Sequence, residues 1–328
     1  LEGNYYYLKS INGFIKLIYQ IISKKYIIHF YNSLGSKPIY NLLKFLPVSK
    51  IIIHERGSAW NSTSSNFEYF VNNAKIAKKI ISNSKATKHL LNLKFQIPLE
   101  KINVIYNGIL EEKIKSSSVI RFSNKISIGY LGRFETQKGI PSFIKTAKIL
   151  SHYNFYLAGY GPWESYISKE INKEKNIFLV GKTKNPTEFL NKIDILVVPS
   201  IREPFGNVIV EAGFCRKAVI ASNVDGISEI INSNKMGILI EPKDKIDFNF
   251  RPINSLMYPE KVFSPFKKRL VKPLQLNPDE LAIKIKEVGE NKSLRIKLGE
   301  NLFKNVNNRF SLNNYFENTE KFYSDIIK

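Results

Sequence analysis

Short apolar segments that alternate with segments of helical spacing constrain the fold of this chain more than any other feature. In the first third, the strand candidates are residues 26–30, 50–54, 79–83 and 101–106. Helix candidates lie before or between them, at 10–23, 36–46, 65–78 and 86–93. Such alternation is typical of a parallel sheet whose strands are joined by helices. The sequence therefore predicts an α/β fold.

A second series of the same kind follows residues 110–123, a segment of low hydrophobicity without periodicity that is typical of an interdomain linker. Its strand candidates each end at Gly, Pro or Ser, and they are 125–131, 154–158, 176–180, 194–198, 218–221 and 237–240. We expect a doubly wound parallel sheet here. The predicted domains are accordingly 1–118 and 119–310.

The periodicity fails between residues 243 and 275, where four prolines and mixed charges predict a long loop or a small excursion. Helical spacing returns afterwards, at 278–289, 293–305 and 311–327.

The charge balance narrows the set of partners. The 328 residues include 50 Lys and Arg but only 28 Asp and Glu, a formal charge of +22 that attracts nucleotide phosphates, nucleic acid or anionic lipid. Ile, Lys and Asn are used heavily throughout, and no arginine-rich block or aromatic-basic alternation occurs, so nucleic acid is not the expected partner.

Cys215 is the only cysteine of the sequence, so no internal disulfide can form and the cytoplasm is the expected compartment. No apolar run reaches the roughly 18 to 20 residues that span a bilayer. Any membrane contact is therefore expected to be peripheral.

The strongest candidate site is the segment from Arg202 to Ala212, which follows the strand at 194–198. Glu203 falls in the predicted loop and Glu211 falls one turn inside the following helix, so both carboxylates can face a ligand at the strand ends. Gly206 permits close backbone approach, and the N–H groups of Asn207 and Val208 suit a phosphate or sugar oxygen. The competing interpretation is that both are surface carboxylates that complement the helix dipole.

A second candidate site is the turn from Gly129 to Gly139, in which Arg133 and Lys138 stand five positions apart before a helix. Two cations at this spacing can clamp a diphosphate, although a solvated turn in a lysine-rich protein would look the same.

His54 closes a strand of the first series, where its neutral imidazole can either contact a ligand or pair with a neighbouring carbonyl. His29, His89 and His152 are expected to be structural.

Together these motifs resemble the Glu-any seven-Glu signature and the surrounding sequence of the family four retaining glycosyltransferases, over residues 26–327. Further matches are 158–162, 178–182, 225–231, 81–84 and 104–109. The resemblance implies the GT-B fold, two Rossmann-like doubly wound parallel-sheet domains facing a cleft. It also implies that a C-terminal helix, 311–328, crosses back to the first domain.

The resemblance implies a role for each candidate residue. Glu203 and His54 would be the catalytic residues, and Glu211 would hold the ribose of the donor. The donor sugar would be bound by Glu203, Pro204, Phe205 and Gly206. The donor diphosphate would be bound by Arg133, Lys138, Asn207 and Val208. Because cations replace the metal ion of other sugar transferases in this family, no metal or other cofactor is expected.

The implied activity is retaining transfer of a sugar from a UDP- or GDP-sugar to a saccharide or lipid-linked acceptor in the synthesis of cell-envelope polysaccharide, such as capsule or lipopolysaccharide. The apolar and basic segment 11–25 can either touch an anionic membrane at the inner face of the plasma membrane or cover the sheet. Two alternatives remain open, namely a nucleotide-sugar 2-epimerase of the same fold and an inactive subunit that only binds the donor.

The sequence departs from the family pattern in several places. Cys215 to Ala218 lack the usual glycine and proline, Asp225 and Gly226 replace two glycines, and the excursion at 243–275 is long. No glycine-rich turn precedes His54, so the first sheet is expected to be incomplete. On this basis the chain as given should bind a nucleoside diphosphate but transfer sugar poorly.

Overall fold

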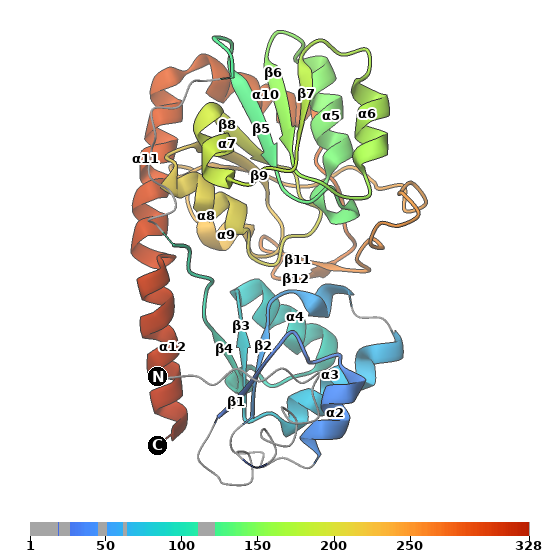
Figure 1. Ribbon diagram of the computed structural model, residues 1–328, viewed down its shortest axis with the longest axis vertical. Helices are drawn as coiled ribbons and strands as arrows, with labels where there is room; N and C mark the ends of the chain where they lie inside the picture. Colours follow the sequence, from blue (N-terminus) through green and yellow to red (C-terminus); the bar gives the residue numbers. More distant parts are fainter. Residues whose placement is uncertain (1–18, 20–26, 45–50, 62–63, 111–121, 328) are drawn as a thin grey trace. The chain divides into compact units, whose positions relative to one another are not determined.

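The computed structural model describes residues 19, 27–44, 51–61, 64–110 and 122–327. The chain divides into two compact units, Leu1–Asn83 with Thr87–Val104, and Ser84–Ala86 with Ile105–Lys328 (Figure 1). The predicted helix at 10–23 lies outside the described residues except for Tyr19, and so does most of the predicted linker at 110–123.

The first unit contains a four-stranded parallel sheet in the order β1-β2-β3-β4. Its strands are β1 (Ile28–Tyr31), β2 (Ile51–Glu55), β3 (Lys79–Ser82) and β4 (Ile102–Val104). Each coincides with a predicted strand. Every residue of β2 is buried, which explains why this strand begins with three consecutive isoleucines and does not alternate between apolar and polar residues.

The helices α2 (Lys37–Leu43), α3 (Ser64–Ile76) and α4 (Lys85–Phe95) connect these strands. Short 3₁₀ turns lie at Ser58–Asn61 and Leu99–Lys101. The α2 helix begins where the Ser36 hydroxyl accepts a hydrogen bond from the Ile39 amide, with Pro38 in the first turn.

The second unit is built on a six-stranded parallel sheet in the order β10-β9-β8-β5-β6-β7. Its strands are β5 (Ser127–Leu131), β6 (Asn154–Ala158), β7 (Ile177–Gly181), β8 (Ile195–Val198), β9 (Ala218–Ser222) and β10 (Ile238–Ile240). The strand order reverses between β5 and β8. This confirms the predicted doubly wound sheet and fixes its switch point, where ligands bind in such sheets.

Helices cover both faces of this sheet (Figure 1). The β8 side chains alternate between two cores, since Ile195 and Val197 pack with α5 and α10 whereas Leu196 and Val198 pack with α7, α8 and α11. The connecting helices are α5 (Ile140–Ile149), α6 (Glu164–Ile171), α7 (Pro186–Lys192), α8 (Asn207–Phe214) and α9 (Ile227–Ile230).

The segment 243–275, predicted to be a long loop or a small excursion, contains a short hairpin. An antiparallel bridge between Asp244 and Gln275 closes its base, and a hairpin forms from β11 (Val262–Ser264) and β12 (Arg269–Val271). Strands of three residues carry too little periodicity to be predicted from the sequence. We call residues 245–272 the clasp.

Three helices complete the chain, α10 (Pro278–Glu290), α11 (Lys292–Arg309) and α12 (Leu312–Ile327), and each matches a predicted helix. That α12 crosses back to the first domain stays a prediction. None of the helices in the described part of the chain is long and apolar enough to cross a membrane.

Candidate functional site

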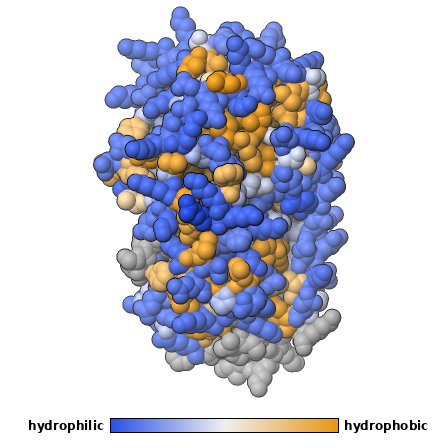
Figure 2. All heavy atoms as spheres, turned by 180° about the vertical axis from the view of Figure 1, so that it is seen from behind, coloured by the Kyte–Doolittle hydropathy of each residue, from blue (hydrophilic) through white to orange (hydrophobic). Residues whose placement is uncertain are grey.

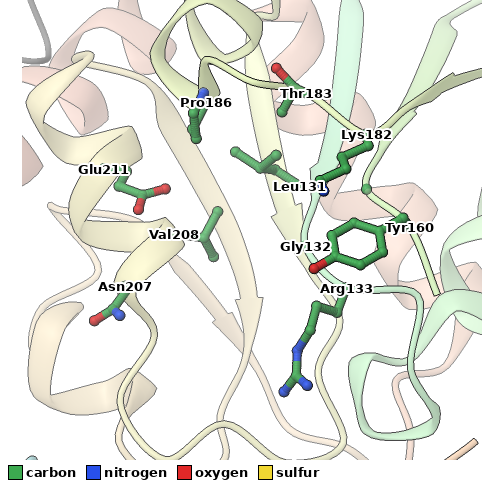
Figure 3. Close-up of a pocket in the computed structure, with 11 residues that line it drawn as sticks. Leu131, Gly132, Arg133, Tyr160, Lys182, Thr183, Pro186, Asn207, Val208 and Glu211 are labelled. Atoms are coloured by element: carbon green, nitrogen blue, oxygen red, sulfur yellow. The ribbon is translucent and has the colours of Figure 1, made fainter. Parts of the chain in front are cut away.

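A pocket of about 310 Å³ lies at the carboxyl ends of β5, β6 and β7, against α8. It lies beside the switch point of the sheet, where the two halves of the strand order diverge. The residues that line it are Leu131, Gly132, Arg133, Gly159, Tyr160, Lys182, Thr183, Pro186, Asn207, Val208 and Glu211 (Figure 3). Four of these, Arg133, Asn207, Val208 and Glu211, were predicted from the sequence.

The α8 helix forms one wall of the pocket through Asn207, Val208 and Glu211 (Figure 3). Gly206 precedes the helix with a φ of 110°, a conformation that L side chains rarely adopt, so the tight entry into α8 requires glycine. Burial raises the pKa of Glu211 to about 7. At neutral pH this carboxyl group is therefore divided between a form that only accepts hydrogen bonds and a form that also donates one.

The opposite wall comes from the loops after β5 and β6. The Tyr130 hydroxyl donates a hydrogen bond of 2.9 Å to the Arg133 carbonyl and so fixes the turn that carries the guanidinium. Gly159 passes so close to this turn that a Cβ atom on it would lie 1.8 Å from the Gly132 carbonyl oxygen. Only glycine fits there, and the two loops form one continuous surface.

Sequence reasoning did not assign site roles to Leu131, Tyr160, Lys182, Thr183 and Pro186, which also line the pocket. The Lys182 ammonium lies 4.8 Å from the centroid of the Tyr160 ring, a cation–π contact on the side of the pocket opposite α8 (Figure 3). Tyr160 follows β6, which neighbours β5, and Lys182 follows β7, the next strand in the sheet. The signal that could have found them is that the carboxyl ends of parallel strands meet at one edge of the sheet.

Glu203 and Lys138 are paired with each other. The Lys138 Nζ lies 2.5 Å from the Glu203 Oε2, and the Ser200 hydroxyl lies 3.4 Å from the same oxygen. The two loops that carry these side chains are also joined by backbone, since the Gln137 carbonyl accepts hydrogen bonds from the Ile201 and Arg202 amides at 2.8 and 3.2 Å. The structure therefore brings together two candidate residues that lie 65 positions apart.

Asp225 holds the backbone of Glu203 in place. Its Oδ2 accepts a hydrogen bond of 2.9 Å from the Glu203 amide, and its Oδ1 accepts one of 2.7 Å from the Phe263 amide in β11. The Gly226 amide donates to the Glu203 carbonyl at 3.1 Å. The departure from two glycines at this position thus creates a contact between the Glu203 loop and the clasp.

The side chain of Phe205 does not face the pocket. It is buried, and its ring packs against Tyr106 and Phe310 with centroid distances of 5.7 and 5.4 Å. Of the predicted sugar-binding segment 203–206, this residue can offer a ligand only its backbone. Asn207 accepts a hydrogen bond of 2.9 Å from the Asn107 side chain through Oδ1, which orients its own amide group.

The turn after α8 is rebuilt, as its lost glycine and proline suggest. Arg216 takes the left-handed conformation with a φ of 53°. Its guanidinium lies 3.7 Å from the centroid of the Phe303 ring and forms an ion pair of 3.0 Å with Glu300. These contacts with α11 compensate for the backbone strain of a non-glycine residue.

His54, in the first unit, is the penultimate residue of β2 and precedes the fully buried Glu55, which ends the strand. Its ring stacks near His29 and Tyr31, with centroid distances of 5.5 and 5.2 Å. Neither of its nitrogens has a hydrogen-bond partner among the described residues, so the alternative interpretation, pairing with a neighbouring carbonyl, is not observed there. Burial, together with the charges of His29 and Arg56, lowers the pKa of His54 to about 3, and the imidazole is neutral.

No group of three or more His, Cys, Asp or Glu side chains within the described ranges is arranged to hold a metal ion. The charged residues that line the pocket are Arg133, Lys182 and Glu211, and the candidate residues Lys138 and Glu203 form an ion pair with each other.

Comparison with protein families matches residues 112–257 to the family described as glycosyl transferases group 1. The capsular polysaccharide biosynthesis glycosyltransferase CapM of Staphylococcus aureus is 28% identical over 243 residues, which are 72% of this chain and 52% of CapM. An N-acetylgalactosaminyltransferase of Campylobacter jejuni that acts on a diphospho-undecaprenol-linked sugar is 26% identical over 218 residues, 62% of this chain and 59% of the relative. The chain thus spans between about half and three fifths of these relatives.

Among solved structures, a glycosyltransferase from Rickettsia africae superimposes with a TM-score of 0.72 at 22% identity, over 100% of this chain and 84% of the other. The Anabaena protein HepE in complex with UDP gives a TM-score of 0.72 at 20% identity, over 96% of this chain and 82% of the other. These likenesses show that the chain has the GT-B fold.

Proposed function

We propose that this chain, whose residues 112–257 belong to the group 1 glycosyltransferases, transfers a sugar from a nucleotide-diphosphate sugar to a saccharide or lipid-linked acceptor. The observation that carries the proposal is the arrangement of one pocket, in which α8 provides the carboxyl group of Glu211 and the first amides of the helix, and Arg133 lies on the opposite wall. A cation and free helix amides suit a diphosphate, and a carboxylate suits the hydroxyl groups of a ribose.

The donor is a UDP- or GDP-sugar. The nucleoside occupies the space between Glu211 and the Tyr160–Lys182 pair, and the diphosphate extends toward Arg133 and the start of α8. HepE, a neighbour with the same fold, is known in complex with UDP, which supports a nucleotide as the ligand.

The sugar then lies near Glu203 and Lys138, beyond the diphosphate. As the bond between the sugar and the phosphate breaks, negative charge grows on the leaving diphosphate, and Arg133 and Lys138 stabilise it. One well-placed group of this kind contributes about 3 to 4 kcal/mol to the transition state. Glu203 orients the sugar ring through its hydroxyl groups, with His54 as a second catalytic residue.

In this mechanism side-chain cations take the place of a metal ion, so neither a metal nor another cofactor is needed. The acceptor hydroxyl attacks from the face that the phosphate leaves, and the anomeric configuration is retained. The acceptor belongs to cell-envelope polysaccharide synthesis, as the names of CapM and of the Campylobacter jejuni relative suggest. The chain works at the inner face of the plasma membrane, where its charge of +22 favours peripheral contact with anionic lipid.

A panel of UDP- and GDP-sugars tests the proposal. Each donor is incubated with the protein, with and without a lipid-linked saccharide and with and without EDTA, and the products are separated by chromatography. Release of nucleoside diphosphate that depends on the acceptor supports transfer. Isomerisation of the donor would indicate a 2-epimerase. Binding of the donor without any reaction would indicate an inactive subunit. Failure to bind any donor would contradict the proposal.

A further inference from the structure

Two carboxylates hold the clasp, residues 245–272, against the two loops that carry the candidate residues. We propose that the clasp positions Glu203 in the sugar subsite, and that Asp225 is the positioning residue through which it acts. This inference rests on the proposed function. It concerns how the sugar subsite is assembled and not the nucleotide pocket.

The first attachment is Asp225 itself, which is 1% exposed and has a φ of 46°. Each of its carboxylate oxygens accepts a hydrogen bond from a backbone amide, one from Glu203 and one from Phe263. Asp225 therefore joins the backbone of the Glu203 loop to β11 of the clasp through a single side chain.

The return bond strengthens this attachment, because the Asp225 amide donates to the Phe263 carbonyl at 2.9 Å. The second attachment lies on the other loop, where the Glu135 Oε2 accepts a hydrogen bond of 3.1 Å from the Leu256 amide. Glu135 is two residues from Arg133 and three from Lys138. The clasp is thus bonded to both loops that meet in the Lys138–Glu203 ion pair.

The clasp is itself seated firmly enough to act as a fixed support. The Asp244–Gln275 bridge closes its base. At its far side, the Phe250 ring packs edge-on against Trp163 and Tyr166 at centroid distances of 5.7 and 5.2 Å. These contacts fix the clasp to the start of α6. Together with the bridge at the base of the clasp, they oppose a displacement of Phe263 relative to the sheet.

Loss of the Asp225 attachment should affect recognition of the sugar and not binding of the nucleotide. Glu203 does not line the nucleotide pocket, whereas Arg133, Asn207 and Glu211 do, and none of these three bonds to Asp225 through the contacts above. A displacement of about 1 Å in a group that contacts the reacting centre can cost on the order of 100-fold in rate. Loss of Asp225 should therefore reduce sugar recognition and turnover and leave nucleoside diphosphate binding intact.

The test compares Asp225→Gly and Asp225→Asn with the matched control Asp247→Asn. Glycine suits the φ of 46° and removes both hydrogen bonds, whereas asparagine keeps one acceptor and places an amide group against the second N–H. Asp247 lies in the clasp and, like Asp225, accepts a hydrogen bond from a backbone amide, that of Asn249 at 3.0 Å. It does not bond to Glu203. Each variant is titrated calorimetrically with UDP and UDP-glucose, and with GDP and GDP-mannose.

We expect the affinity for the nucleotide sugar, relative to its nucleoside diphosphate, to fall by about 10-fold or more in both Asp225 variants. The affinity for the nucleoside diphosphate and the behaviour of the Asp247 control should stay within about twofold of the parent protein. Hydrogen exchange of the Glu203 and Phe263 amides should become faster in the Asp225 variants, a readout that needs no ligand.

Unchanged exchange at both amides, or an unchanged affinity ratio with faster exchange, would overturn the inference. If the parent protein binds no nucleotide at all, the proposed function fails instead, and the exchange measurement still reports on the attachment. Should Asp225→Gly fail to fold, Asp225→Asn provides the same comparison.

Discussion

The side chains of Lys138 and Glu203 form an ion pair with an N–O distance of 2.5 Å, although the sequence assigned them to different parts of a ligand, diphosphate and sugar. In the structure each side chain is a partner of the other. A donor must therefore either share this pair or replace it, and the effects of the two side chains on binding should not be additive.

Replacing Glu203 with alanine should lower turnover by about 100-fold or more, because the carboxylate acts on the reacting sugar. The measurement is kcat with the best donor of the panel. Glu188→Ala, which removes an exposed carboxylate paired with Lys192 on α7, is the control and should leave kcat unchanged. Near-normal turnover in Glu203→Ala would remove this residue from the mechanism.

Arg133→Ala and Lys138→Ala should both weaken the binding of nucleoside diphosphate by roughly 10-fold or more, while EDTA leaves activity unchanged. The control is Lys148→Ala, which removes the exposed partner of Glu170. Calorimetry on Lys138→Ala, Glu203→Ala and the double variant should yield a coupling energy different from zero. A strict requirement for a divalent metal would contradict the proposal that the side chains of Arg133 and Lys138, and not a metal ion, bind the diphosphate.

Binding of UDP-glucose or GDP-mannose should weaken as the pH falls below about 7, because Glu211 has its pKa near 7 and its ionised form accepts the ribose hydroxyls. The expected loss approaches about 10-fold per pH unit below this pKa. These diphosphate diesters do not titrate in this range, which makes them better probes than the free diphosphates. A Glu211→Gln variant should bind with little pH dependence between pH 5.5 and 8, and a profile like that of the parent protein would exclude Glu211 as its cause.

The same carboxyl group should affect stability with the opposite sign. Its pKa is raised by folding, so between the usual carboxyl pKa and about 7 the folded state holds more protons than the unfolded state. The free energy of unfolding therefore falls as the pH rises through this range. Glu211→Gln should raise the melting temperature at pH 8 and change it little at pH 5, and the reverse order would show that burial does not disfavour the carboxylate.

Gly159→Ala should abolish nucleotide binding, because its Cβ would meet the Gly132 carbonyl oxygen at 1.8 Å and push apart the two loops that together form one wall of the pocket. Gly181→Ala is a matched control. It also has a positive φ, 77°, but its Cβ would meet no atom within 4 Å. Both variants are strained by roughly 1 to 2 kcal/mol in the backbone, so only the difference between them reports on the contact. Equal affinities in a fluorescence titration would contradict this account.

The strands of both sheets could be predicted because parallel strands are buried on both faces and appear as apolar runs such as 51–53 and 195–198. The hairpin of the clasp could not, because its strands are short and stand among prolines. Arg133 and Glu211, which line the pocket, could be located because their motifs follow β5 and β8, whereas Lys182, which follows β7, was missed.

The contacts of these residues depend on the fold. Asp225 lies 22 residues from Glu203 and 38 from Phe263, and no spacing in the sequence indicates that one carboxylate accepts from both amides. Nor does any feature of the sequence indicate that the Phe205 ring points into the core, where it packs against Tyr106. A motif identifies which residues lie at a site, whereas tertiary packing decides which of their atoms face it.

The Asp225 contacts also bear on how this protein can be re-engineered. Replacing residues 245–272 with a short connection would remove the Phe263 amide and leave a nearly buried carboxylate without one of its donors, at a position that favours glycine. The converse change, glycine at 225 with the long segment kept, removes the acceptor of a buried amide. Residue 225 and the segment 245–272 should therefore be exchanged together. Chimaeras in which only one of the two is exchanged should fold less stably than chimaeras in which both are exchanged.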